Sequence, residues 1–435
     1  MHILHKKTLF IITLLTLSTS IFATPMQSTA QSTSDGVQAG AYYDLSYATE
    51  NPSWISGEND LRIVYPERAP KEGYTEVGTT AFIKKEILAA KTTGLKYFIL
   101  PLTVNNTGIA ETQAFSRMKS LLNEGEFRFI PQFALKDIIL FQEQWKTAVS
   151  AISGETTLFK SASAGIPVYI SYDFNTATPE ERSQLSTLLK DPAYAQLRFY
   201  AVSDLFKTPA TTTAVAGLSG TGLSSAVNGL IQESALFPCD KEVYGKAFND
   251  IENLVYANGF NPLSHCSISP VGGGSTEYRL FNANYFAQYL KNKPVISERA
   301  NTLVSLGFKG VIGDKYLPWV KQTSSWVYYE TFRESAVRLW NSALKLKPGI
   351  PVFPSMIVAH DSFYMENSFD TTVMAGSPKL YESLLDTVEA IFQRTYPEGY
   401  LVTAGDWNNY KTGNLLLPTK TYGTAYIDLL TSHLR

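Results

Sequence analysis

The chain has 435 residues, of which 44% are hydrophobic and 17% charged, so it holds enough apolar material for a large globular core. Its formal net charge of −2 excludes a strongly basic nucleic-acid-binding protein. Tyr and Trp occur 25 and 6 times. Most of these rings are expected in the core, and a few at a ligand surface.

The first 23 residues have the order of an export signal. His5, Lys6 and Lys7 precede an apolar stretch (9–17) and then small residues (18–23). This pattern predicts a cleaved signal peptide rather than a membrane span. Cleavage after Ala30 and a retained anchor are the alternatives. Residues 24–38, rich in Ser, Thr and Gln, predict a disordered spacer. We therefore expect a secreted or periplasmic protein with no stable membrane insertion after cleavage.

The chain contains two cysteines, Cys239 and Cys266. In an exported protein they are expected to form one disulfide, with two free thiols as the alternative. The five histidines are scattered, so no metal site is predicted. Glycines 272–274 lack the spacing of a phosphate-binding loop, and no cofactor is expected.

Strand-like and helix-like segments alternate through the rest of the sequence. Strands are predicted at 41–46, 97–103, 128–133, 167–173, 199–203, 262–267, 310–313, 351–358 and 400–404. Helices are predicted at 81–92, 112–122, 138–152, 179–189, 241–258, 328–346 and 380–393. This alternation predicts an α/β fold, a single (β/α)₈ TIM barrel over residues 39–435. One strand is in excess, so 199–203 or 262–267 is assigned to an insertion within 191–277.

The stretch that carries most information about function follows the last predicted strand. Gly405 is followed by Asp406, Trp407, Asn408, Asn409 and Tyr410. In parallel α/β proteins ligands bind at the carboxyl ends of strands. Amides and carboxylates there suit sugar hydroxyls, and the rings suit sugar C–H faces. Alternatively, these side chains only cap the turns of a polar loop.

Residues 406–419, DWNNYKTGNLLLPT, resemble the last-strand motif of glycoside hydrolase family 99, of the WbsX-like proteins and, more distantly, of family 71. The matching positions are Trp407, Asn408, Gly413, Leu416, Pro418, Thr419, Tyr422 and Gly423. Asn409 and Thr412 stand where family 99 has its two catalytic glutamates. The resemblance implies a TIM barrel with a sugar pocket, and the replaced glutamates weaken the case for the family's reaction.

Earlier segments extend this resemblance over most of the chain after the predicted spacer. Residues 41–44, with Trp54 downstream, look like the aromatic-rich first strand of these barrels. Segments 80–100 and 165–173 are similar to their second and fourth strands. Segment 306–311 matches a later strand entry, with Lys309 in place of the usual Asp.

Glycoside hydrolysis normally requires two carboxyl groups across the bond. Strand ends supply Asp44, Asp173, Asp204, Asp314, Asp361 and Asp406. Asp406, Asp173 and Asp361 are the catalytic candidates, although each could instead bond its own turn or cap a helix. His360 beside Asp361 is a candidate proton relay or ligand contact. The remaining candidates for substrate binding are Tyr43, Trp54, Tyr172, Trp407, Asn408, Asn409 and Tyr410.

If the partner is a carbohydrate, these residues suggest two possible functions for the protein. The first is hydrolysis of an α-linked polysaccharide with a relocated acid pair; the second is glycan binding by a catalytically inactive barrel. A third alternative is a structural or adhesive protein without a ligand site. Both carbohydrate hypotheses predict that Trp407, Asn408, Asn409, Tyr43 and Asp173 share one cleft.

Overall fold

The computed structural model describes residues 36–56, 59–110, 112–161, 165–174, 176–203, 205, 297–313, 326–329, 349–360, 372–374 and 376–434, and single positions between 332 and 344. The predicted signal peptide, most of the predicted spacer and both cysteines, Cys239 and Cys266, lie outside the described residues. Among the described residues, no helix has the length and apolar character needed to cross a bilayer.

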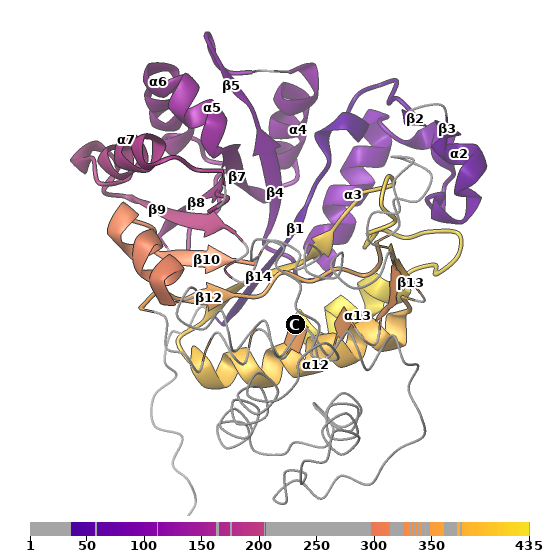
Figure 1. Ribbon diagram of the computed structural model, residues 1–435. Helices are drawn as coiled ribbons and strands as arrows, with labels where there is room; N and C mark the ends of the chain where they lie inside the picture. Colours follow the sequence, from indigo (N-terminus) through magenta and orange to yellow (C-terminus); the bar gives the residue numbers. More distant parts are fainter. Residues whose placement is uncertain are drawn as a thin grey trace, which may run out of the picture. The chain divides into compact units, whose positions relative to one another are not determined.

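Eight parallel strands form the central sheet (Figure 1). In spatial order they are β1 (Val37–Tyr42), β4 (Tyr97–Leu102), β7 (Arg128–Ala134), β8 (Ile166–Ser171), β9 (Leu197–Val202), β10 (Gly310–Ile312), β12 (Val352–Phe353) and β14 (Tyr400–Asp406). From β1 to β12, each of these strands pairs with the one that follows it in this order, and β14 pairs with β1. This order is that of a (β/α)₈ barrel.

The barrel closes between β12 and β14. A parallel bridge joins Ser355 to Thr403 just beyond the end of β12. The Met356 amide donates to the Thr403 carbonyl at 2.8 Å, and the Thr403 amide donates to the Pro354 carbonyl at 3.0 Å. Together with the β1–β14 pairing, these bonds complete the ring of strands. The predicted TIM barrel is therefore confirmed.

Helices follow most of the strands. Their bounds are α3 (Thr80–Thr92), α4 (Gln113–Glu124), α5 (Leu135–Leu140), α6 (Gln142–Ser153), α7 (Pro179–Leu189), α12 (Pro378–Thr395) and α13 (Ala425–Leu434). Side-chain caps set four of the starts: Thr79, Thr112, Thr178 and Ser377 accept from backbone amides of α3, α4, α7 and α12. The single predicted helix 138–152 is two helices, α5 and α6, which meet at Phe141.

Aromatic rings fill the barrel interior. The ring centroid of Tyr169 (β8) lies 6.0 Å from that of Tyr200 (β9). The Tyr200 centroid lies 6.0 Å from that of Phe353 (β12). Two glycines provide the space: a Cβ at Gly40 would lie 2.0 Å from the Tyr97 ring, and one at Gly310 would lie 2.8 Å from the Tyr200 ring. Glycine in these two strands is thus required by packing rather than by backbone conformation.

Three details of the predicted elements are corrected. Segment 199–203 is the barrel strand β9, so the predicted insertion at 191–277 does not begin before the end of β9; its other candidate strand, 262–267, lies outside the described residues. The first strand covers 37–42 rather than 41–46, and it includes the last two residues of the predicted spacer. Pairing with β14 and β4 on both sides outweighs the weak strand preference of this Gly- and Ala-containing segment.

Candidate functional site

A cleft of about 720 Å³ lies at the carboxyl-terminal end of the barrel. We call it the mouth cleft, and it is lined by Tyr42, Pro101, Gln132, Ala134, Leu135, Lys136, Ser171, Tyr172, Asp173, Thr176, Ala177, Glu181 and Val202. These residues belong to the ends of β1, β4, β7, β8 and β9 and to the segments that follow β7 and β8. The volume falls in the range of small-molecule sites, and the location is where TIM barrels bind ligands.

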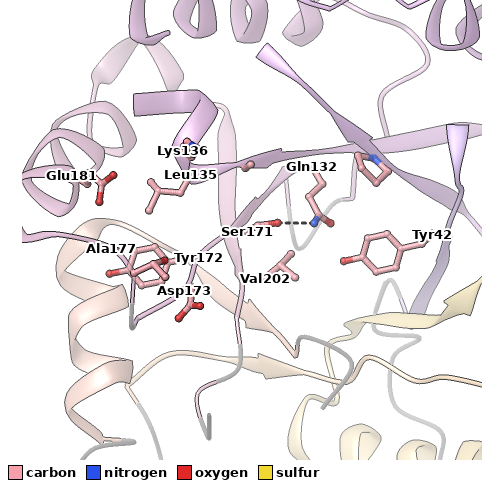
Figure 2. A pocket seen from close by; sticks show the side chains of 13 residues that line it. Tyr42, Gln132, Leu135, Lys136, Ser171, Tyr172, Asp173, Ala177, Glu181 and Val202 are labelled. Atoms are coloured by element: carbon pink, nitrogen blue, oxygen red, sulfur yellow. Dashed lines mark hydrogen bonds between the residues drawn. The ribbon is translucent and has the colours of Figure 1, made fainter. Parts of the chain in front are cut away.

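The floor of the mouth cleft carries a polar pair. Gln132 of β7 donates from Nε2 to the Ser171 hydroxyl of β8 at 2.8 Å (Figure 2). Gln132 Oε1 accepts no hydrogen bond from the described residues and is shielded from bulk solvent. A buried acceptor without a protein donor is suited to a ligand hydroxyl.

The charged side chains of the mouth cleft come from the segments after β7 and β8. Asp173 is partly exposed, and Lys136 is exposed. Glu181 has a structural role, because it accepts the Thr178 amide at 2.7 Å in a capping box at the start of α7. This bond holds the pKa of Glu181 below its ordinary value. Asp173 is the other carboxyl group that lines the cleft.

Aromatic rings border the cleft on two sides. In Figure 2, Tyr42 lies on one side of Val202, and Tyr172 and Asp173 lie on the other. Tyr172 is buried against Phe174 and Phe308, at ring distances of 4.9 and 6.0 Å. Burial raises the pKa of its hydroxyl, which stays neutral. Of the predicted site residues, Tyr172 and Asp173 line this cleft.

Tyr43 does not line the cleft, because consecutive strand residues face opposite ways. Its side chain is fully buried, and its hydroxyl donates to Glu86 Oε2 of α3 at 2.7 Å. Trp407 is also fully buried and packs against Phe98, with ring centroids 5.7 Å apart. The structure thus places both rings between the barrel wall and α3, and it does not bring them together with Asp173.

Glu86 is a buried carboxyl group beside these two rings. Burial raises its pKa to about 8 from the ordinary value of 4.5, although the Tyr43 hydroxyl and the Trp407 indole act in the opposite direction. The pKa of the Tyr43 hydroxyl is also raised, by burial first and then by Glu86. The Glu86 carboxyl group is therefore mostly protonated at neutral pH and forms part of the core.

The side chains of the 406–412 segment bond mainly within the protein. Asn409 Nδ2 donates to Asp406 Oδ2 at 2.7 Å, and Asn409 Oδ1 accepts the Thr412 amide at 3.2 Å. Asp406 is 3% exposed and pairs in register with Tyr42. The end of β14 therefore borders the side of the mouth cleft that Tyr42 lines.

A set of contacts holds the 406–419 segment against residues 54–74. Arg68 donates from Nη1 to the Tyr410 and Lys411 carbonyls, at 3.1 and 2.7 Å. Gly413, with φ of +71°, leaves room for Arg68, since a Cβ there would lie 2.9 Å from its Nε. The fully buried Tyr410 packs edge-on against Trp54 at 5.3 Å. Their role as sugar platforms stays a prediction, one that this packing does not favour.

Two other predicted residues lie after β12. Asp361 is outside the described residues, so its catalytic role stays a prediction. His360 is partly buried. Within the described part of the chain, no group of three or more His, Cys, Asp or Glu side chains is arranged to hold a metal ion.

The lining residues that were missed from the sequence include Tyr42, Gln132, Lys136 and Ser171. A signal was available for two of them. Gln132 and Ser171 are polar residues within otherwise apolar strand runs, near strand ends. Polar groups there face either the barrel mouth or a helix, and the sequence does not say which.

No protein-family model matches the sequence, and no curated protein matches it significantly. The chain is similar to solved structures at low identity. A "glycoside hydrolase-like protein" shows 11% identity and a TM-score of 0.48, over 92% of this chain and 94% of that one. A GH99 endo-α-mannosidase from Bacteroides thetaiotaomicron shows 8% identity and a TM-score of 0.47, over 91% and 96%. The catalytic domain of a β-amylase from Paenibacillus polymyxa shows 10% identity and a TM-score of 0.32, over 92% and 98%. The TIM-barrel fold of this chain follows from its strand order and from the closure between β12 and β14.

Proposed function

We propose that the protein is an exported, glycan-active barrel that binds a carbohydrate chain in the mouth cleft and hydrolyses an α-linkage in it. The observation that carries the proposal is the lining of that cleft at the carboxyl ends of the strands. Gln132 and Ser171 offer hydrogen bonds to sugar hydroxyls, and Tyr42 and Tyr172 offer ring surfaces. The resemblance of residues 406–419 to family 99 supports a sugar as the ligand, and the signal-like residues 1–23 support export.

In this proposal Asp173 and Asp406 are the carboxyl pair. Asp173 lines the cleft, and Asp406 ends the strand whose register partner is Tyr42. One of the two would act as the general acid and the other as the nucleophile or base.

A second candidate function is glycan binding without hydrolysis. It is favoured by one observation: the side chains at the two glutamate positions of the resembled motif are Asn409 and Thr412, and Asn409 bonds within its own loop. Amides cannot act as general acids, so catalysis would need carboxyl groups from elsewhere.

The test is reducing-sugar release from α-mannans, α-glucans and bacterial polysaccharides, together with calorimetric binding of the same glycans. The variants are Asp173→Asn and Asp406→Asn. Asp191→Asn is the matched control, because Asp191 lies before β9 at the opposite end of the barrel, where it caps a short helix as Asn also can.

Hydrolysis that both site variants reduce by at least about a thousandfold, while the control does not, supports the enzyme. Binding without release, weakened by Asp173→Asn, supports the second candidate. Neither binding nor release with any glycan contradicts both.

A further inference from the structure

A second cavity, of about 280 Å³, opens at the amino-terminal end of the barrel. Its lining comes from β1, β9, β12 and β14 and from the segments that lead into β10, β12 and β14. None of its lining residues belongs to the mouth cleft. We call it the amino-end cavity.

The amino-end cavity has an aromatic floor and wall. Tyr200 and Phe353, whose rings lie 6.0 Å apart, belong to the interior layer of the barrel. Tyr396 lies 5.4 Å from Phe353. Gly310 keeps this surface flat, since a Cβ there would lie 2.8 Å from Tyr200 and 2.9 Å from Phe353. The lining of the cavity is therefore largely aromatic, with Leu401 and Pro351 as its aliphatic members.

Its rim carries two cationic side chains, Arg198 and Lys309, both exposed. Arg198 Nη1 donates to the Ala195 and Leu197 carbonyls at 3.1 and 3.4 Å, which orients the guanidinium and leaves Nε and Nη2 for another acceptor. Burial raises the pKa of the Tyr200 hydroxyl to about 12, and the positive charge of Arg198 acts in the opposite direction.

Among the described residues, no carboxylate lines the amino-end cavity. A carboxylate beyond the lining, Glu389, acts on the pKa of Tyr400, which is raised by burial first. Two cations at the rim over an aromatic floor are complementary to a ligand that is flat at one end and negative at the other. This charge balance differs from that of the mouth cleft, where Asp173 and Glu181 face one cation, Lys136.

We propose that the amino-end cavity binds a small organic anion with a single flat ring, of the aryl carboxylate class. The carboxylate pairs with Arg198 and Lys309, where a guanidinium offers two parallel N–H donors. The ring packs on Tyr200 and Phe353. A volume of 280 Å³ is just below the usual range of ligand sites and limits the ligand to about one ring. This inference is independent of the proposed function.

The test uses three probes with the full chain: benzoate, benzyl alcohol as its neutral counterpart, and acetate as the anion without a ring. Binding is measured by calorimetry and by ligand-observed NMR. The variants are Arg198→Gln and Lys309→Gln, and the matched control is Lys136→Gln, an exposed cation that lines the mouth cleft. Thermal unfolding of each variant shows that it is folded.

We expect benzoate to bind at least about tenfold more tightly than either other probe, and Arg198→Gln to weaken it by about tenfold, with Lys136→Gln unchanged. Equal binding of benzoate and benzyl alcohol would overturn the role of the cations. An equal loss in the control variant, or no binding of benzoate, would overturn the site.

Discussion

The Asn408 side chain exchanges two hydrogen bonds with the backbone of Asp44. The Asp44 amide donates to Asn408 Oδ1 at 2.7 Å, and Asn408 Nδ2 donates to the Asp44 carbonyl at 3.2 Å. Asn408 is 1% exposed. The side chain therefore ties the segment after the last strand to the segment after the first, and its burial keeps it out of reach of a ligand.

Asn408→Ala is expected to destabilise the protein by about 2 kcal/mol, because it leaves the Asp44 amide without its acceptor and removes one of the two hydrogen bonds to the Asp44 carbonyl, the other coming from the Tyr47 amide. The measurement is urea unfolding. Asn123→Ala, at the exposed end of α4, is the control and should change stability by less than about 0.5 kcal/mol. If the two variants unfold at the same urea concentration, the hydrogen bonds between Asn408 and Asp44 contribute little to stability.

Gly40→Ala is expected to lower the free energy of unfolding by about 3 kcal/mol, since its Cβ would lie 2.0 Å from the Tyr97 ring inside the barrel. Gly349→Ala is the matched control: its φ is not in the left-handed region, and the nearest atom to its Cβ would be 4.0 Å away. Urea unfolding compares the two. Combining Gly40→Ala with Tyr97→Leu should recover part of the loss, and no recovery would argue against this clash.

Glu86 is expected to make stability fall as pH rises. Its folded pKa, about 8, lies above its ordinary value of 4.5. The folded state therefore binds the proton more tightly, and this stabilisation is fully present below about pH 4.5 and is lost as pH rises through about 8. Glu86→Gln keeps the size and removes the titration.

Stability of the parent and of Glu86→Gln is measured by urea unfolding between pH 4 and pH 9. The parent should lose on the order of a few kcal/mol relative to the variant over this range. Glu124→Gln removes an exposed carboxyl paired with Lys84 and serves as the control. Parallel curves for the parent and Glu86→Gln would show that the carboxyl is charged in the folded protein.

Gln132→Ala is expected to weaken glycan binding about tenfold, because it removes both the donor to Ser171 and the Oε1 acceptor, which accepts no hydrogen bond from the described residues. Gln393→Ala, at an exposed position of α12, should leave affinity unchanged. Both are measured by calorimetry with any glycan that the parent binds. Unchanged affinity of Gln132→Ala would place the glycan away from the floor of the cleft.

The strands of this barrel are predictable from sequence, and the faces of their residues are not. Segment 97–102 is an apolar run because both sides of a barrel strand are buried, one by the barrel interior and one by helices. The same burial hides the alternation, so nothing local distinguishes Tyr42, which lines the mouth cleft, from Tyr43, which bonds to Glu86. The partner of Asn408 was likewise not predictable, since Asp44 is far away in the sequence.

The pairing of the last strand with the first determines when the barrel can be completed. Val37 pairs with Tyr400, so β1 and the segment after β12 each lack one neighbour until nearly the whole chain has been synthesised. Contacts between such distant residues form slowly, and unpaired strand edges invite association with other chains. Closure is therefore expected late in folding. A chain that stops before Tyr400 would keep two open edges and be prone to aggregate, however well its other strands pair.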